Sequence, residues 1–321
     1  MDDQTVMQAA STAAEAWGGA EGTPRLVLNR ENAVLDVRLR SGWRGALRLH
    51  RPGYQTREAI RSELRWMESL ADAGFACPWP LRTQDEDFIY HTQTGQVVSM
   101  LQWLDAAPIG PVERTCASAA DTRTALYGDL GALLADLHLT ADLTAPRDLI
   151  RPSWDARALC CSEAPLWGRF WTHPALDQDE ADLLRAARDA ARNRLMELGT
   201  DGTGLIHADV LQENVLRKDH QLYLIDFDDC GHGYRHYDLA TALIQHVDSP
   251  EYEALTSALW TGYVDAGGPL PDSARADLPM FVMLRAMASA GWIIDRAPAD
   301  DPRQSAYAAR AVNLARAFLK P

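Results

Sequence analysis

The sequence contains little cysteine, and its cysteines form no pattern of pairs. There are five, an odd number, and no two have the Cys-x-x-Cys spacing of redox motifs and many zinc sites. Cys160 and Cys161 are adjacent, an arrangement that is more often structural than catalytic. We therefore expect neither a disulfide framework nor a cysteine-based zinc site, and we expect a reducing compartment.

The sequence also lacks an apolar run long enough to span a membrane. Its first residues, MDDQTVMQAASTAAEAWGG, are acidic and have neither the basic start nor the long apolar core of a secretory signal. We therefore expect a cytoplasmic protein with no membrane partner.

Basic residues are in the minority. The chain has 31 Lys and Arg against 45 Asp and Glu, which gives a formal net charge of −14. A general nucleic-acid binder needs a basic surface, so we expect no nucleic-acid partner. The acidity is compatible with a cationic substrate, although it also serves solubility. The sequence does not indicate the oligomeric state.

The first hundred residues have the pattern of a small antiparallel sheet with one helix. Short apolar runs separated by turns predict strands. These runs cover residues 25–29, 33–40, 45–50, 86–90 and 97–101. Residues 56–73 carry apolar side chains at helical spacing, with Thr56 as a candidate N-cap and Gly74 as a candidate stop.

Beyond residue 104 the pattern is largely helical. The predicted helices cover residues 122–138, 178–198, 238–247, 251–266, 277–295 and 303–319. At 321 residues the chain exceeds what one compact core usually holds. We predict an α+β chain of two lobes, with residues 1–104 as an N-terminal lobe and 105–321 as a larger helical lobe.

One stretch concentrates the chemistry. Residues 205–229 read LIHADVLQENVLRKDHQLYLIDFDD, with Asp209 and Asn214 in a His-x-Asp-x-x-x-x-Asn arrangement. Two apolar runs separated by a polar turn follow, and the second ends at Asp226. The pattern predicts a loop, a hairpin, and an acid at the end of the second strand. Isolated polar residues of this kind are usually surface charges, but the spacing of all three disfavours that reading.

Phosphoryl transfer needs such a set of side chains. The transferred group is negatively charged and requires Mg²⁺ held by hard oxygen ligands, which Asn214 and Asp226 can supply. Asp209 can accept or orient the proton of an attacking hydroxyl. We predict a catalytic role for Asp209.

With these motifs the sequence resembles the aminoglycoside phosphotransferase and choline kinase-like family, relatives of protein kinases. Further matching segments are LNRENAV, LRLHRPG, IDFDDCGHG and LRAMASAGWIIDR, and they point to the branch of bacterial stress response kinase A and homoserine kinase type II. The resemblance implies a bilobal protein kinase-like fold with nucleotide-binding and catalytic lobes. It also implies an ATP- and Mg²⁺-dependent enzyme and a structural role for His207.

The resemblance implies a nucleotide-binding role for Arg48, where the family usually has a lysine that contacts ATP phosphates and pairs with a glutamate. Glu63 is the candidate partner, with a solvated helix charge as the alternative. An arginine can bridge a carboxylate and a phosphate, but its reach differs from that of lysine. The hairpin tip at residues 30–32 has no glycine and gives little support for a phosphate-binding loop.

The resemblance also assigns adenine binding to the backbone of Gln102, Trp103 and Leu104, although an edge strand has the same pattern. Asp238 matches a family aspartate that braces the catalytic loop, and an ordinary helix start is the alternative. Asp228 and Asp229 are candidate substrate contacts, with ligands of a second Mg²⁺ or a solvated acidic turn as the alternatives.

Two classes of function remain open. The first is a kinase that phosphorylates a hydroxyl of a small metabolite, a homoserine-like amino acid, an aminoglycoside-like compound or a protein Ser/Thr. The second is a nucleotide-binding pseudokinase that acts as an interaction module. The intact set of Asp209, Asn214 and Asp226 favours the kinase, whereas Arg48 leaves room for the pseudokinase. A hydrolase is disfavoured because the sequence lacks a Gly-x-Ser-x-Gly motif.

Overall fold

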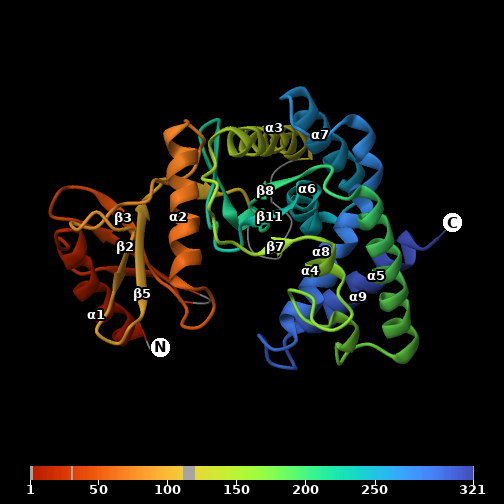
Figure 1. The fold of residues 1–321 in the computed structure, drawn as a ribbon, viewed down its shortest axis with the longest axis horizontal. Helices are drawn as coiled ribbons and strands as arrows, with labels where there is room; N and C mark the ends of the chain where they lie inside the picture. Colours follow the sequence, from red (N-terminus) through yellow and green to blue (C-terminus); the bar gives the residue numbers. More distant parts are fainter. Residues whose placement is uncertain (1–2, 30–31, 111–119, 321) are drawn as a thin grey trace. The chain divides into compact units, whose positions relative to one another are not determined.

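The computed structural model describes residues 3–29, 32–110 and 120–320 (Figure 1). By its internal contacts the chain divides into two compact units. Unit 1 comprises Met1–Ala107, Thr144–Arg151 and Leu216–Asp228, and unit 2 comprises Pro108–Leu143, Pro152–Val215 and Asp229–Pro321. The lobes assigned to residues 1–104 and 105–321 stay a prediction.

A five-stranded antiparallel sheet forms the centre of unit 1, in the order β1-β2-β3-β5-β4. The strands are β1 (Arg25–Asn29), β2 (Ala33–Arg38), β3 (Arg44–Leu49), β4 (Ile89–His91) and β5 (Val97–Gln102). The strand predicted at 86–90 was placed too early. Residues 83–87 form a turn in which the N–H of Glu86 donates to the carbonyl of Thr83, and Glu86 has a φ of 61°. The strand therefore begins only at Ile89.

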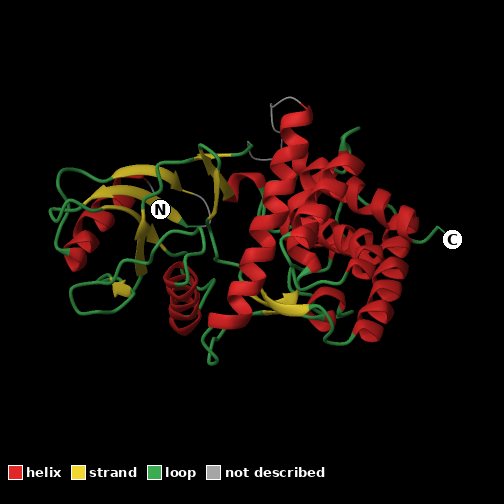
Figure 2. Ribbon diagram, turned by 90° about the horizontal axis from the view of Figure 1, so that it is seen from above, coloured by secondary structure: helices red, strands yellow, loops and turns green. Residues whose placement is uncertain are grey.

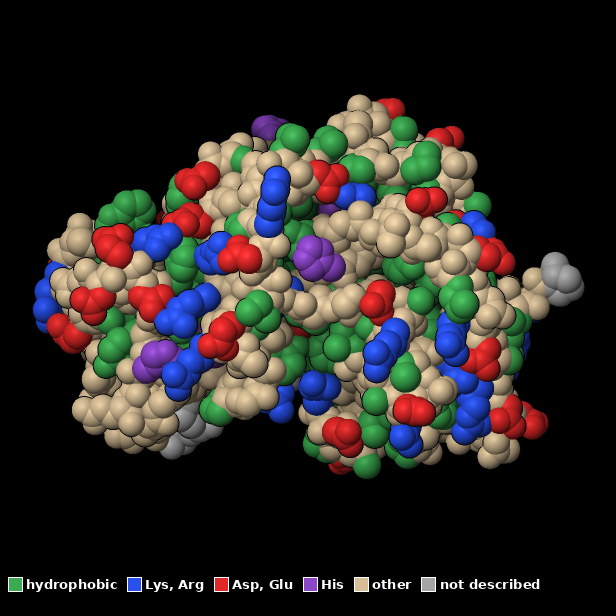
Figure 3. Space-filling model, viewed as in Figure 1, with side chains coloured by type: hydrophobic (Ala, Val, Ile, Leu, Met, Phe, Trp, Pro, Cys, Tyr) green, Lys and Arg blue, Asp and Glu red, His purple; other side chains and the backbone are tan. Residues whose placement is uncertain are grey.

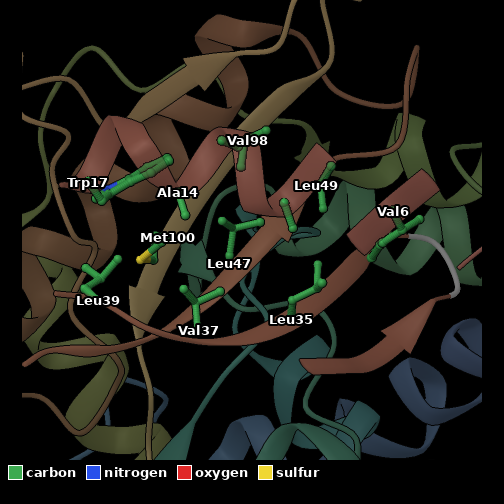
Figure 4. Close-up of a cluster of buried hydrophobic side chains, with 13 residues drawn as sticks. Val6, Ala14, Trp17, Leu35, Val37, Leu39, Leu47, Leu49, Val98 and Met100 are labelled. Carbon is green, nitrogen blue, oxygen red and sulfur yellow. The ribbon is translucent and has the colours of Figure 1, made fainter. Parts of the chain in front are cut away.

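One face of this sheet is covered by α1 (Asp3–Ala13) and the 3-10 turn η1 (Ala14–Trp17). Alternation along β3 directs Leu47 and Leu49 to this face, where they join a buried apolar cluster. The labelled members of that cluster in Figure 4 are Val6, Ala14, Trp17, Leu35, Val37, Leu39, Leu47, Leu49, Val98 and Met100. Arg48, between the two leucines, therefore points to the opposite face.

Helix α2 (Arg57–Asp72) provides the partner for Arg48. The Thr56 hydroxyl accepts a hydrogen bond from the N–H of Ala59 at 3.1 Å, which caps the helix as predicted. Past its end, Gly74 has a φ of 91°, a left-handed conformation that favours glycine. Both ends of the helix are thus set by local sequence.

The predicted hairpin consists of β9 (Val215–Lys218) and β10 (Gln221–Leu224). A short strand, β6 (Ala107–Pro108), extends it to three strands in the order β10-β9-β6. Within unit 1 the N–H of Leu224 donates to the carbonyl of Ala76. Trp66 and Phe227 pack edge to face with ring centroids 5.4 Å apart. These contacts fix the segment that carries Asp226 inside unit 1.

Unit 2 is mainly helical, as Figure 2 shows. Its helices are α3 (Ala120–Thr144), α4 (Ala156–Cys160), α5 (Gln178–Leu198), α6 (His236–Leu243), α7 (Tyr252–Asp265), α8 (Leu278–Ile293) and α9 (Pro302–Phe318). A small sheet has the order β7-β11-β8, with β7 (Ser153–Trp154), β8 (Thr203–Ile206) and β11 (Gly231–Tyr234). The six helices predicted after residue 104 are confirmed, with ends that differ by up to six residues.

Two local features of unit 2 set the start of one helix and the close approach of two others. Asp177 and Glu180 form a capping box at the start of α5, so this helix begins where it was predicted. Helices α3 and α7 approach closely at Gly128 and Gly262. A Cβ on Gly262 would lie 2.0 Å from the carbonyl oxygen of Gly128, so only glycine fits there.

Two buried histidines, His236 and His246, should make the stability of the chain dependent on pH. Burial lowers the pKa of His236 and of His246 to about 4. In the unfolded chain each binds a proton near pH 6.5, whereas the folded chain does so only near pH 4, so the unfolded state gains protons first as pH falls. The free energy of unfolding should therefore fall through this window, by up to about 1.4 kcal/mol per pH unit for each histidine.

Denaturant unfolding across this window measures the effect. His246→Gln should flatten the slope, and the same change at the exposed His220 should not. A pH-independent unfolding free energy would contradict the prediction.

No helix in the described residues is long and apolar enough to cross a membrane. On the face shown in Figure 3, acidic and basic side chains are interspersed and do not gather by sign. The acidity of the chain is therefore not concentrated in one patch on that face.

Candidate active site

The carboxylate of Asp238, in the first turn of α6, binds the backbone of the loop that begins at His207. Its Oδ2 accepts a hydrogen bond from the N–H of His207 at 2.9 Å, and its Oδ1 accepts one from the N–H of Ala208 at 2.7 Å. Ala208 has a φ of 68°, a left-handed conformation that is strained for alanine. The predicted bracing of the loop by Asp238 is confirmed.

The side chain of His207 is buried, and its Nδ1 accepts a hydrogen bond from the N–H of Asp209 at 3.2 Å. This contact fits the structural role predicted for the histidine. Asp238 in turn contacts Nε2 of His138 at 3.1 Å, and Nδ1 of that ring lies 2.9 Å from the hydroxyl of Tyr263. The strained loop therefore rests on a fully buried polar network.

Asp238→Ala should lower the free energy of unfolding by about 3–5 kcal/mol, because it leaves two buried N–H groups and His138 without their acceptor. Denaturant unfolding checks this. Asp129→Ala, at an exposed position of α3, should change stability by less than about 0.5 kcal/mol. Equal stabilities of the two variants would show that the loop does not depend on Asp238.

Both carboxylate oxygens of Asp209 have a donor within unit 2. Nδ2 of Asn214 donates to Oδ2 at 2.9 Å, and Nη2 of Arg285 donates to Oδ1 at 3.1 Å. Nδ2 of Asn214 also donates to the backbone carbonyl of Asp209 at 2.9 Å. The amide group of Asn214 is thereby oriented, and its Oδ1 has no hydrogen-bond partner within the described chain. That oxygen can serve as a ligand for a hard cation.

Asp226 follows β10 and has a φ of 64°. Left-handed backbone at a residue other than glycine is strained, and such strain gathers at functional positions. Its side chain is 50% exposed, and Oδ1 lies 3.4 Å from Nη1 of Arg48. A half-exposed carboxylate held in a fixed backbone conformation can ligate a metal ion.

Arg48 and Glu63 form a buried ion pair, so their predicted pairing is confirmed and the solvated alternative for Glu63 is excluded. Burial by itself lowers the pKa of Arg48, but the carboxylates of Glu63, Asp228 and Asp226 raise it above its ordinary value. Burial raises the pKa of Glu63, although Arg48 opposes this. The arginine therefore remains a cation on the face of the sheet opposite α1.

Asp228 is buried in unit 1. Its Oδ2 accepts a hydrogen bond from Nδ2 of Asn32 at 3.2 Å, and its backbone carbonyl accepts from Gln55 and Arg151. Three buried atoms of this region have no partner within the described residues: Nε of Arg48, Oε2 of Glu63 and Oδ1 of Asp228. These contacts favour a role for Asp228 in holding the segment after Asp226, and its predicted substrate contact stays untested.

Two of the three backbone N–H groups predicted to bind adenine already donate hydrogen bonds within the protein. The N–H of Gln102 donates to the carbonyl of Trp79 at 2.7 Å, and the N–H of Trp103 donates to the carbonyl of Arg44 at 3.0 Å. Among the described residues the N–H of Leu104 has no hydrogen-bond partner. Leu104 is therefore the residue of the three whose N–H can serve a ligand.

Asp229 belongs to unit 2, where it is half-buried and its backbone carbonyl accepts a hydrogen bond from Nε1 of Trp154 at 3.0 Å. The structure thus groups Asp209, Asn214 and Arg285 in unit 2. In unit 1 it groups Arg48, Glu63, Asp226 and Asp228. The predicted tip at residues 30–32 lies outside the described residues, except for Asn32.

Two residues at the site were missed by sequence reasoning. Arg285 lies in the segment LRAMASAGWIIDR, which marks it only as part of the family resemblance. A signal was present, because Arg285 is the one charged residue of α8. Arg151 lies in a loop without periodicity, so no sequence pattern could have revealed its contact with Asp228.

The chain is similar in sequence to known proteins. A model described as the phosphotransferase enzyme family matches residues 25–277. An uncharacterized protein from Deinococcus radiodurans is 30% identical over 285 residues, covering 85% of this chain and 78% of that protein. A homoserine kinase from Neisseria meningitidis serogroup B is 32% identical over 160 residues, covering 46% of this chain and 47% of the kinase.

Solved structures share the fold. A microcompartment-associated aminopropanol kinase has a TM-score of 0.83 at 28% identity and covers 99% of this chain and 98% of its own. An amicoumacin kinase in complex with AMP-PNP, Ca²⁺ and Ami has a TM-score of 0.79 at 20% identity, and the match covers 99% of this chain and 94% of that one. A spectinomycin phosphotransferase with ADP and spectinomycin has a TM-score of 0.64 at 14% identity, covering 99% and 98%. The predicted kinase-like fold class is confirmed.

Proposed function

Because the chain belongs to the phosphotransferase enzyme family, we propose that it transfers the γ-phosphoryl group of ATP to the hydroxyl group of a small amino alcohol. The observation that carries this proposal is the carboxylate of Asp209, held at both oxygens and one quarter exposed. A fixed, accessible carboxylate suits a residue that receives or orients a hydroxyl proton.

In this mechanism Asp209 accepts the proton of the acceptor hydroxyl. The oxygen of that hydroxyl bonds to the γ-phosphorus while the bond from this phosphorus to the β,γ-bridging oxygen breaks, and ADP leaves. Asp209 then releases its proton to solvent. The protein contributes mainly positioning and electrostatic stabilisation, as expected for phosphoryl transfer.

We assign metal binding to the amide oxygen of Asn214 and the carboxylate of Asp226. Among the described residues no three His, Cys, Asp or Glu side chains are grouped as a metal site. One amide and one carboxylate nevertheless suit Mg²⁺, which keeps several waters and binds few protein ligands. When bound, this ion neutralises phosphate charge.

We assign nucleotide binding to residues 1–104 and catalysis with acceptor binding to residues 105–321. Arg48, held by Glu63, would contact phosphate oxygens through its guanidinium group. The N–H of Leu104 would donate to adenine, next to Gln102 and Trp103, whose N–H groups are already engaged. ATP supply also makes the cytoplasm the expected location.

The acceptor class is supported by the names of two relatives. Aminopropanol and homoserine each carry a hydroxyl and an amino group. The kinases named for them are 28% identical over 99% of this chain and 32% identical over 46% of it. We assign the ammonium group of the acceptor to the half-buried Asp229, whereas the burial of Asp228 makes it less suited to that contact.

A panel of acceptors tests the proposal. The purified protein is incubated with ATP, Mg²⁺ and 1-amino-2-propanol, homoserine, ethanolamine or a spectinomycin-type aminoglycoside, and ADP and phosphorylated product are measured. Propane-1,2-diol, which lacks the amine, is the matched control and should react poorly. Absence of product with every acceptor would overturn the proposal.

A nucleotide-binding pseudokinase is the second candidate, and the contact of Arg48 with Asp226 favours it. An arginine cation beside the metal carboxylate competes with a metal ion for that oxygen. A thermal shift with ATP and Mg²⁺ in the absence of any product or autophosphorylation would support this alternative.

A further inference from the structure

The catalytic loop from His207 to Asn214 contains no lysine or arginine. The cation next to its carboxylate comes from α8, 76 residues later. All residues of α8 except Arg285 are uncharged (LPMFVMLRAMASAGWI). A largely buried charge in such a helix is unfavourable unless a specific partner compensates it.

Arg285 is held in place from its own helix. Nη1 donates to the hydroxyl of Ser289 at 2.6 Å, and that hydroxyl lies 3.2 Å from the backbone carbonyl of Arg285. Only 13% of the side chain is exposed. Burial by itself lowers the pKa of Arg285, but Tyr237 and Asp209 raise it above its ordinary value. The guanidinium group is therefore a fixed, permanent cation.

Asn214 and Arg285 donate to different oxygens of the Asp209 carboxylate. Asn214 reaches Oδ2, and Arg285 reaches Oδ1. A carboxylate held at one oxygen can still rotate about its terminal bond, whereas one held at both has a single orientation.

We propose that Arg285 is a positioning residue for Asp209. Together with Asn214, Arg285 fixes the Asp209 carboxylate in the orientation that receives the acceptor hydroxyl. This role rests on the proposed function of Asp209. Misplacement of a reacting group by about 1 Å lowers rates by about 100-fold. Loss of Arg285 should therefore lower kcat by about 10- to 100-fold and leave the KM for ATP within about twofold.

A double-mutant cycle separates this role from a purely structural one. Arg285→Met is compared in the wild type and in Asp209→Asn, with ATP and the best acceptor of the panel. If Arg285 acts through Asp209, the substitution Arg285→Met should lower kcat in the wild-type background. It should have almost no further effect in the Asp209→Asn background. Arg285→Lys, which keeps the charge but not the planar fork, should recover part of the activity.

Arg188→Met is the matched control. Arg188 is also buried in a helix of unit 2 and pairs with an aspartate, Asp189, outside the motif. Arg188→Met should leave kcat within about twofold of the wild type. Unfolding curves report whether each variant is folded, and Arg285→Gln replaces Arg285→Met if that variant is not.

Three results would overturn the role. They are a wild-type kcat in Arg285→Met, an equal factor of loss in both backgrounds, and a loss that appears only in the KM for ATP. Absence of transfer by the wild type would instead overturn the proposed function, and this role with it.

Discussion

Asp209→Asn should lower the turnover number for phosphate transfer by about 10²–10⁴-fold, the usual contribution of a positioned acid or base. Asparagine has nearly the same shape as aspartate, and its amide oxygen can still accept a hydrogen bond from Arg285 or Asn214. It cannot accept a proton from the acceptor hydroxyl. The expected loss is therefore in kcat, with the KM for ATP little changed.

Turnover of ATP with the best acceptor measures this effect, and thermal unfolding shows whether the fold is retained. Asp277→Asn is the control, because Asp277 is also an ion-paired aspartate of unit 2, bound by Arg194 at 2.7 Å. It should retain normal turnover. Wild-type kcat in Asp209→Asn would mean that this carboxylate takes no part in the reaction.

Asp226→Asn should lower both metal affinity and turnover by about 100-fold or more. Loss of groups that merely support a metal ligand already costs about 10- to 100-fold, and here a proposed ligand itself loses its charge. The backbone should not change, because asparagine tolerates a left-handed conformation as well as aspartate does. Mn²⁺ binding in the presence of AMP-PNP, followed by electron paramagnetic resonance, measures the affinity without turnover.

Asp219→Asn provides a close match for this experiment. Asp219 lies in the turn of the same hairpin and has a φ of 54°. Its substitution should leave Mn²⁺ binding and turnover unchanged. Equal Mn²⁺ affinities in Asp226→Asn and the wild type would remove Asp226 from the metal site.

Local signals explain which parts of the fold could be predicted. The helix at 56–73 was predicted because Thr56 and Gly74 mark its ends, and the structure places it at Arg57–Asp72. The strand at 86–90 was misplaced because an apolar pattern does not reveal the turn at Glu86. Sequence patterns therefore identify elements well where a cap or a period defines them.

The same reasoning applies to the site. Pairing of Arg48 with Glu63 could be predicted because strand alternation and helical spacing each present one charge beside apolar neighbours. The contact of Arg285 with Asp209 could not, because it depends on how α8 packs beside a loop 76 residues earlier. The contact of Asp228 with Asn32 likewise joins residues that lie far apart in the sequence.

The alternation in β3 also restricts how the sheet can assemble. Leu47 and Leu49 belong to the cluster beneath α1, and Arg48 between them pairs with Glu63. A shift of one residue would exchange the two faces, placing the cation among apolar side chains and two leucines beside a buried carboxylate. A shift of the strand by one residue is therefore unfavourable, and a sheet that has folded correctly already presents its arginine on the side proposed to bind nucleotide.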